Sequence, residues 1–301
     1  MILNGASQAT VERYIFLQAQ SAELQQRWNA VRDYRDYYGG DHPVFLTDRQ
    51  QEYLGPLMTR AEHTVAFNVC KAVVDTLRER IKVEGFTGKG AAGEALAEKA
   101  AEWFRDAQMD VQQITIHRRT GRDGNGYVIV DWDAEGEHPR WVPGRAYDGR
   151  EGITYHIDPD TNQPIMAIKY WTVTNPLGVN HGEKRRTVYL PDRILRQRED
   201  PKGEYGWGPI DPIEGKPLQW WVNPMPVDGF EPDASAEPLG VACVQWQTPG
   251  GVSDIEDLIG LQNGINKTML DLLAAGSPCL NSLGVIPTIL LNSVLKYRAS
   301  L

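Results

Sequence analysis

The stretch from Ser253 to Ala275 constrains the fold more than any other part of the chain. Ser253 and Glu256 match a capping box, in which each side chain can bond to the free backbone N–H of the other residue at a helix start. After them, apolar and amide side chains recur every three or four residues, as they do on one face of an α-helix. These side chains are Ile255, Leu258, Ile259, Gln262, Ile265, Asn266, Met269 and Leu272. The pattern predicts one long helix over residues 253–275.

The amides on this face leave two interpretations open. A helix in an ordinary core is usually more uniformly apolar, whereas amides between packed helices fix their register at some cost in stability. The helix is therefore either a plain amphipathic helix or one that packs against copies of itself. In the second case the expected packing positions are Ile255, Leu258, Gln262, Ile265, Asn266 and Met269. Ile265→Asp would then abolish assembly.

The rest of the chain predicts an α+β fold, with N-terminal helices, a central antiparallel β region and then the long stem-like helix. Strand-like residues at 127–132 are expected to pair with 140–142, and the turn formers at 158–164 predict a hairpin between strands at 153–157 and 165–173. Further elements are expected as helices at 24–38, 68–85, 97–107 and 111–120 and as strands at 187–190 and 241–246.

Three parts follow from this order: a domain over residues 1–252, the helix at 253–275, and an atypical tail over 276–301. The tail contains no Asp, Glu or Trp, and Pro278 and Pro287 are expected to interrupt any helix there. We expect either a genuine pair of apolar strands or an out-of-frame or prematurely ended segment.

The net charge of −9, from 40 acidic and 31 basic residues, argues against a protein that grips DNA by neutralising phosphates. It fits a surface past which DNA slides without sticking, or simply an acidic surface that keeps the protein soluble. No apolar run is long enough to span a membrane, and Met1 to Val11 do not form a signal peptide. The three cysteines lack metal-ligand spacing, and Cys70 is expected to be a core thiol in a protein made in a reducing cytoplasm.

Sequence motifs for chemistry are sparse. The glycine-rich run at 85–90 lacks the spacing of a phosphate-binding loop, the histidines show no paired ligand spacing, and no serine stands in a nucleophile elbow. We therefore expect no catalytic residue, no metal and no cofactor. The alternative is a β-rich carbohydrate-active enzyme or binding module. It would stack sugars on Trp207, Trp220 and Trp221 and use the carboxylates of Asp131 and Asp133.

Four segments are informative through their order and spacing. The first begins Tyr-Arg-Asp-Tyr-Tyr-Gly-Gly-Asp-His-Pro at Tyr34 and continues with Asn-Val-Cys-Lys-Ala-Val-Val-Asp at Asn68. The others are residues 118–132, residues 167–171 with 188–192, and the Leu-Gln-Asn-Gly-Ile-Asn-Lys-Thr run at Leu261. With these segments, most of residues 20–275 resembles the portal proteins of long-tailed, siphovirus-type bacteriophages.

The resemblance implies a non-enzymatic virion protein, made in the bacterial host cytoplasm, that forms a ring at one capsid vertex. Such rings are usually dodecamers, they contact the major capsid and scaffolding proteins, and double-stranded DNA passes through them during packaging and ejection without sequence-specific binding. Residues 1–252 would correspond to most of the wing and residues 253–275 to the first stem helix.

Portal proteins continue past this helix into a clip domain, a second stem helix and a crown, whereas the tail after Gly276 resembles none of these. The chain would then be a portal truncated after its first stem helix, without the contacts to the terminase and the head–tail connector. A decayed prophage product is a further alternative.

Overall fold

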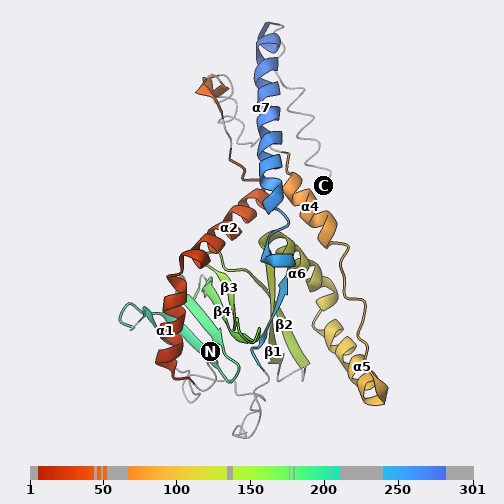
Figure 1. The fold of residues 1–301 in the computed structure, drawn as a ribbon, viewed down its shortest axis with the longest axis vertical. Coiled ribbons are helices and arrows are strands. Elements are labelled where there is room, and N and C mark those ends of the chain that lie inside the picture. The colour runs from red at the N-terminus through yellow and green to blue at the C-terminus, as the bar shows by residue number, and fades with distance from the viewer. Residues whose placement is uncertain are drawn as a thin grey trace. The chain divides into compact units, whose positions relative to one another are not determined.

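The computed structural model describes residues 6–43, 46–48, 50–52, 67–133, 138–175, 177–178, 180–203, 205–210 and 240–282; side chains are not described at 131–138, 209, 273 and 275–282. Helices and antiparallel sheets make up the fold (Figure 1), which confirms the predicted α+β class. The chain divides into two compact units. Unit 1 comprises residues 1–35 and 74–254, and unit 2 comprises residues 36–73 and 255–301. This division differs from the predicted boundary at 252, because residues 36–73 group with the long helix.

Two antiparallel sheets form the centre of unit 1. The three-stranded sheet has the order β2-β1-β8, and the five-stranded sheet is a meander from β3 to β7. Ile129 lies opposite Val142, and Ile153 lies opposite Lys169, so both predicted hairpins are confirmed. The strands are β1 (Asn125–Asp133), β2 (His138–Arg145), β3 (Gly152–Ile157), β4 (Pro164–Thr172), β5 (Lys184–Tyr189), β6 (Ile194–Glu199), β7 (Trp207–Pro209) and β8 (Cys243–Gln247).

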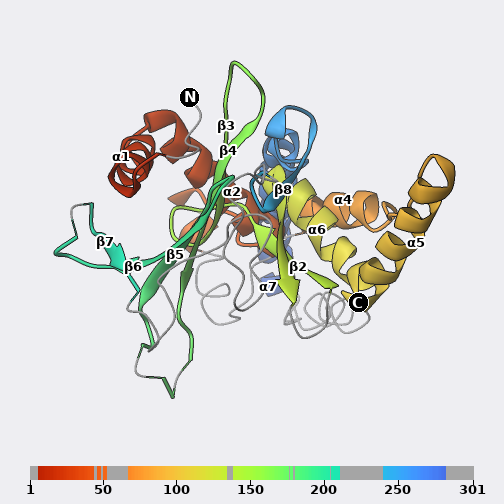
Figure 2. The same ribbon diagram turned by 90° about the horizontal axis from the view of Figure 1, so that it is seen from below.

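Different helices of unit 1 cover the two sheets (Figures 1 and 2). Helix α1 (Gln8–Ala19), which the sequence analysis missed, buries Val11 and Ile15 against Ile168 and Val188 of the five-stranded sheet. Helix α6 (Met109–Asp123) instead packs Ile116 against Val128 of β1. The other helices that carry residues of unit 1 are α2 (Ala22–Gly39), α4 (Val69–Arg78) and α5 (Gly90–Asp106).

An arginine of α2 neutralises a buried carboxylate at the end of α6. A carboxylate in the last turn of a helix faces the negative end of the helix dipole, so Asp123 needs cationic partners. The Arg35 guanidinium donates to Asp123 at 2.8 Å, to Asp148 at 2.6 Å and to the carbonyl of Ala146 at 2.6 Å. Arg122 donates to Asp123 at 2.7 Å. The network joins α2, α6 and the segment that follows β2.

The helix at the end of the described chain differs from its predicted bounds. A short 3₁₀ turn, Glu256–Leu258, precedes α7, which runs from Ile259 to Ser282 rather than from residue 253 to 275. The prediction that Pro278 interrupts any helix is therefore wrong. A proline removes one hydrogen bond and strains the preceding turn. The leucines and alanines at 272–275 are strong helix formers and offset this cost.

His156 makes unit 1 sensitive to acid. It is a partly buried side chain of β3, with its ring edge-on to Tyr14 of α1 and Nε2 3.3 Å from the Thr154 hydroxyl. Burial lowers its pKa from 6.5 to about 4. Below pH 6.5 His156 binds a proton in the unfolded chain, whereas in the folded chain it stays unprotonated until about pH 4. The free energy of unfolding therefore falls as the pH falls through this window.

The difference between the two pKa values sets an upper limit of about 3 kcal/mol on this loss. We expect a smaller loss because the side chain is only partly shielded from water. Urea unfolding at pH 7 and pH 5 measures the part of this loss that falls above pH 5. His156→Gln should flatten the pH dependence, whereas the exposed His181→Gln should leave it unchanged. Equal pH dependence in the wild type and both variants would contradict the assignment.

Candidate functional site

Gln262 of α7 is the centre of a buried polar network in unit 2. Its side chain is 0% exposed. Its Oε1 accepts the backbone N–H of Val69 at 2.8 Å, and its Nε2 donates to the carbonyl of Phe67 at 2.6 Å. Val69 is the first residue of α4, where backbone N–H groups have no partner within the helix. Gln262 therefore caps a helix distant in sequence, while Asn68 caps the same helix locally by accepting from the N–H of Lys71.

The network continues from Gln262 to a histidine in one fixed direction. Gln262 Nε2 donates to Asn266 Oδ1 at 2.9 Å, Asn266 Nδ2 lies 3.1 Å from His42 Nδ1, and His42 Nε2 lies 2.9 Å from the carbonyl of Tyr37. The N–H of Val69 can only donate and the carbonyl of Tyr37 can only accept. These two backbone groups assign the amide orientations and place the proton of a neutral His42 on Nε2.

The six predicted packing positions therefore form two groups on neighbouring strips of the segment, one buried and one more exposed. Gln262 and Asn266 bond within their own chain, and Ile255 is fully buried. Leu258 and Ile265 are half-buried, and Met269 is 39% exposed. That these six residues contact a second copy stays a prediction. Of the six, only Leu258, Ile265 and Met269 have side chains exposed enough to contact another copy.

A second apolar stripe accompanies those three residues. Leu261 and Leu272 are 56% and 64% exposed, and they continue the three- and four-residue spacing of Leu258, Ile265 and Met269. We call these five residues the open face of α7, although Leu258 belongs to the 3₁₀ turn that precedes the helix. Leu261 was missed in the sequence analysis because the stripe containing Gln262 shows equally good helical spacing.

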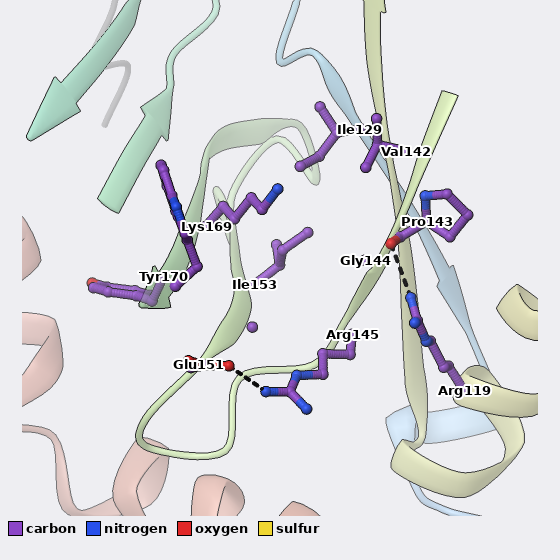
Figure 3. Close-up of a pocket in the computed structure, with 12 residues that line it drawn as sticks. Arg119, Ile129, Val142, Pro143, Gly144, Arg145, Glu151, Ile153, Lys169 and Tyr170 are labelled. Carbon is purple, nitrogen blue, oxygen red and sulfur yellow. Dashed lines mark hydrogen bonds and ion pairs between the residues drawn. The ribbon is translucent and has the colours of Figure 1, made fainter. Parts of the chain in front are cut away.

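Unit 1 contains a cavity of about 360 Å³ between its two sheets (Figure 3). Cationic side chains reach it from α6 (Arg119), from the end of β2 (Arg145) and from β4 (Lys169). Arg119 donates to the carbonyl of Pro143 at 2.9 Å, and Arg145 donates to Glu151 at 2.7 Å. This site could not be predicted from the sequence, because its residues come from five separate elements and match no motif.

The electrostatics of the cavity follow from burial and crowding. Burial, together with nearby Arg140, lowers the pKa of Lys169. The pKa of Arg119 is also lowered, first by burial and then by Arg122, with Arg145 and Arg35 adding to the effect against the opposing charge of Asp123. An anion in the cavity would therefore relieve repulsion between like charges.

The residues of the carbohydrate alternative are only partly described. Trp207 packs under the guanidinium of Arg186 at 4.5 Å and lies edge-on to Tyr170 at 6.0 Å, so one face of its ring is used within the chain. Trp220, Trp221 and the side chains of Asp131 and Asp133 lie outside the described residues.

Cysteine and metal chemistry find little support in the described part of the chain. Cys70 and Cys243 are buried; burial raises the pKa of both thiols, that of Cys243 to about 12, so neither forms a thiolate near neutral pH. No cluster of His, Cys, Asp or Glu among the described side chains is arranged to hold a metal ion. Within the described residues, no helix has the length and apolar character needed to cross a bilayer.

Comparison with known proteins adds no relative. No protein-family model matches the chain, and a search of curated proteins finds no match.

Proposed function

We propose that this chain is a non-enzymatic structural protein that assembles with copies of itself through the open face of α7, as a phage portal does through its stem helices. The observation that carries the proposal is the contrast between two neighbouring strips of one helix. The face with Gln262 and Asn266 is saturated by hydrogen bonds within the chain. The open face is apolar, three of its five residues are exposed, and an exposed apolar surface of this kind marks a protein contact.

Two properties of α7 suit contact with an identical helix. Its ionic residues, Lys267 and Asp271, form an i,i+4 pair on the helix itself, so two copies meet without net repulsion. Exposed Gly264 and Thr268 lie beside the open face, and small side chains allow close approach of helix backbones. A contact between the open face and a different face of the next copy is head-to-tail and closes into a ring when the rotation allows.

The remaining parts of the proposal rest on the portal resemblance. The ring would stand at the capsid vertex of a virion, bound to the major capsid and scaffolding proteins, with double-stranded DNA passing through it. The net charge of −9 supports a channel to which DNA does not adhere.

Ile265→Asp is expected to abolish assembly of the full chain, because an unpaired carboxylate would be buried at every contact. We expect a dissociation constant raised by more than about 100-fold. Mass photometry and sedimentation velocity measure the distribution of assembled species. Leu177→Asp is the matched control, since it adds the same charge at a 96% exposed leucine of unit 1. A wild type that stays monomeric, or an oligomer indifferent to Ile265→Asp, would refute the proposal.

A further inference from the structure

The cavity of unit 1 has a charge opposite to that of the whole chain. Its lining carries the three cations Arg119, Arg145 and Lys169 and the single carboxylate of Glu151, whereas the chain as a whole has a net charge of −9. A cluster of cations in an acidic protein needs an explanation, because like charges in a concave, partly desolvated site repel one another.

Hydrogen-bond donors remain available in this cavity. No carboxylate among the described residues pairs with Lys169, whose ammonium lies over the ring of Trp171 at 5.4 Å. An ammonium has three donors and a guanidinium has five. Arg119 uses one nitrogen on the carbonyl of Pro143, and Arg145 uses one on Glu151, so each arginine keeps further donors (Figure 3).

Apolar side chains make up much of the remaining lining of the cavity. Ile129, Val142 and Ile153 come from β1, β2 and β3, and Trp171 comes from β4, whereas the ring of Tyr170 points away from these three aliphatic side chains (Figure 3). A cavity of about 360 Å³ lined by apolar side chains and a few charged groups has the character of a small-molecule site. The combination selects an anion that carries an apolar or aromatic group rather than a bare ion.

We propose that this cavity binds an organic phosphate monoester, with the phosphate on Lys169, Arg119 and Arg145 and the organic group against Ile129, Val142 and Ile153. A phosphate monoester carries a charge of about −1.5 to −2 at pH 7, which matches three cations set against one carboxylate. The tetrahedral oxygens can accept from the ammonium and from both guanidinium groups. This site lies within unit 1 and does not depend on self-association through α7.

The first experiment titrates the full chain with phenyl phosphate at low ionic strength by isothermal titration calorimetry, with inorganic phosphate as a second probe. We expect saturable one-to-one binding of phenyl phosphate and weaker binding of inorganic phosphate, which lacks the apolar group. Lys169→Met keeps the side-chain length and removes the charge. It should weaken phenyl phosphate binding by roughly tenfold to a hundredfold.

Lys184→Met is the matched control. Lys184 lies on β5 of the same sheet, is exposed and pairs with Glu199, so its replacement changes the net charge of the chain equally. It should leave binding within about twofold of wild type. Circular dichroism of both variants separates loss of binding from loss of folding, and Lys169→Arg, which keeps the charge, should restore part of the affinity.

Three results would overturn the proposal. They are no saturable binding of phenyl phosphate to the wild type, equal weakening by Lys169→Met and Lys184→Met, and Lys169-dependent binding of an acidic peptide but not of phenyl phosphate. The last would identify the cavity as a contact for an acidic protein segment instead.

Discussion

Replacing Arg35 by methionine is expected to lower the free energy of unfolding by about 3 kcal/mol. The guanidinium holds Asp123, whose side chain is 0% exposed, and Asp148, and it also donates to the carbonyl of Ala146. Methionine fills a similar volume without any of these donors. Arg122 still contacts Asp123, so the buried charge keeps one partner, and we place the loss at the lower end of values measured for broken buried pairs.

Urea unfolding followed by far-UV circular dichroism measures this loss. Arg32→Met is the control, because Arg32 lies on the same helix and its described hydrogen bond is an exposed one to Asn29. It should change the free energy of unfolding by no more than about 0.5 kcal/mol. Similar small effects of both substitutions would show that the network around Asp123 contributes little to stability.

Replacing Gln262 by leucine is expected to destabilise the packing of α7 on the start of α4 by about 3 kcal/mol. Leucine has a similar size but leaves the Oδ1 of Asn266 without this partner in a buried environment, and the N–H of Val69 and the carbonyl of Phe67 in a partly buried one. Each group so stranded costs about 1–3 kcal/mol, partly offset by the burial of an apolar side chain.

Amide hydrogen exchange is the sharpest measurement, because it reports on each unit separately. The amide of Val69 should exchange roughly a hundredfold faster in Gln262→Leu, while amides of β1 in unit 1 stay unchanged. Leu261→Ala, one residue earlier on the open face, should leave Val69 protected and weaken self-association instead. A protected Val69 amide in Gln262→Leu would show that the hydrogen bond to Gln262 contributes little to this packing.

The α+β class and both hairpins could be predicted because their signals are local. Turn formers such as Asp158 and Pro159 stand between β-branched runs, and Asp158 accepts the N–H of Asp160 within the turn. The predicted helices at 97–107 and 111–120 agree with α5 and α6 to within several residues. Such patterns need no knowledge of what lies across the fold.

Elements that depend on distant partners were missed. The sequence of β6, Ile-Leu-Arg-Gln-Arg-Glu, has no clear alternation, yet Gln197 is almost fully buried. Its amide donates to Glu12 of α1 at 2.6 Å and accepts from Arg186 of β5 at 2.7 Å. Helix α1 was missed for the same reason, because its buried Glu12 accepts not only from Gln8 on the same helix but also from Gln197 of the folded sheet.

The hydrogen-bond network around Gln262 could not be predicted either, because its partners are distant in sequence. The polarity of Gln262 and Asn266 is plain in the sequence, but the sequence does not state whether their partners lie in the same chain or in another copy. The structure places His42 and Val69, more than 190 positions away along the chain, at hydrogen-bonding distance. The cationic cavity likewise arises only when β2, β4 and α6 pack together.

The fixed direction of the hydrogen bonds from Val69 to Tyr37 has a consequence for how this protein can change during evolution. Gln262, Asn266 and His42 each serve as donor to one neighbour and acceptor from another, so replacing one of them leaves the others mismatched. Related chains should therefore exchange the three residues as a set. A lineage that loses the histidine should also replace both amides, and single replacements should be rare.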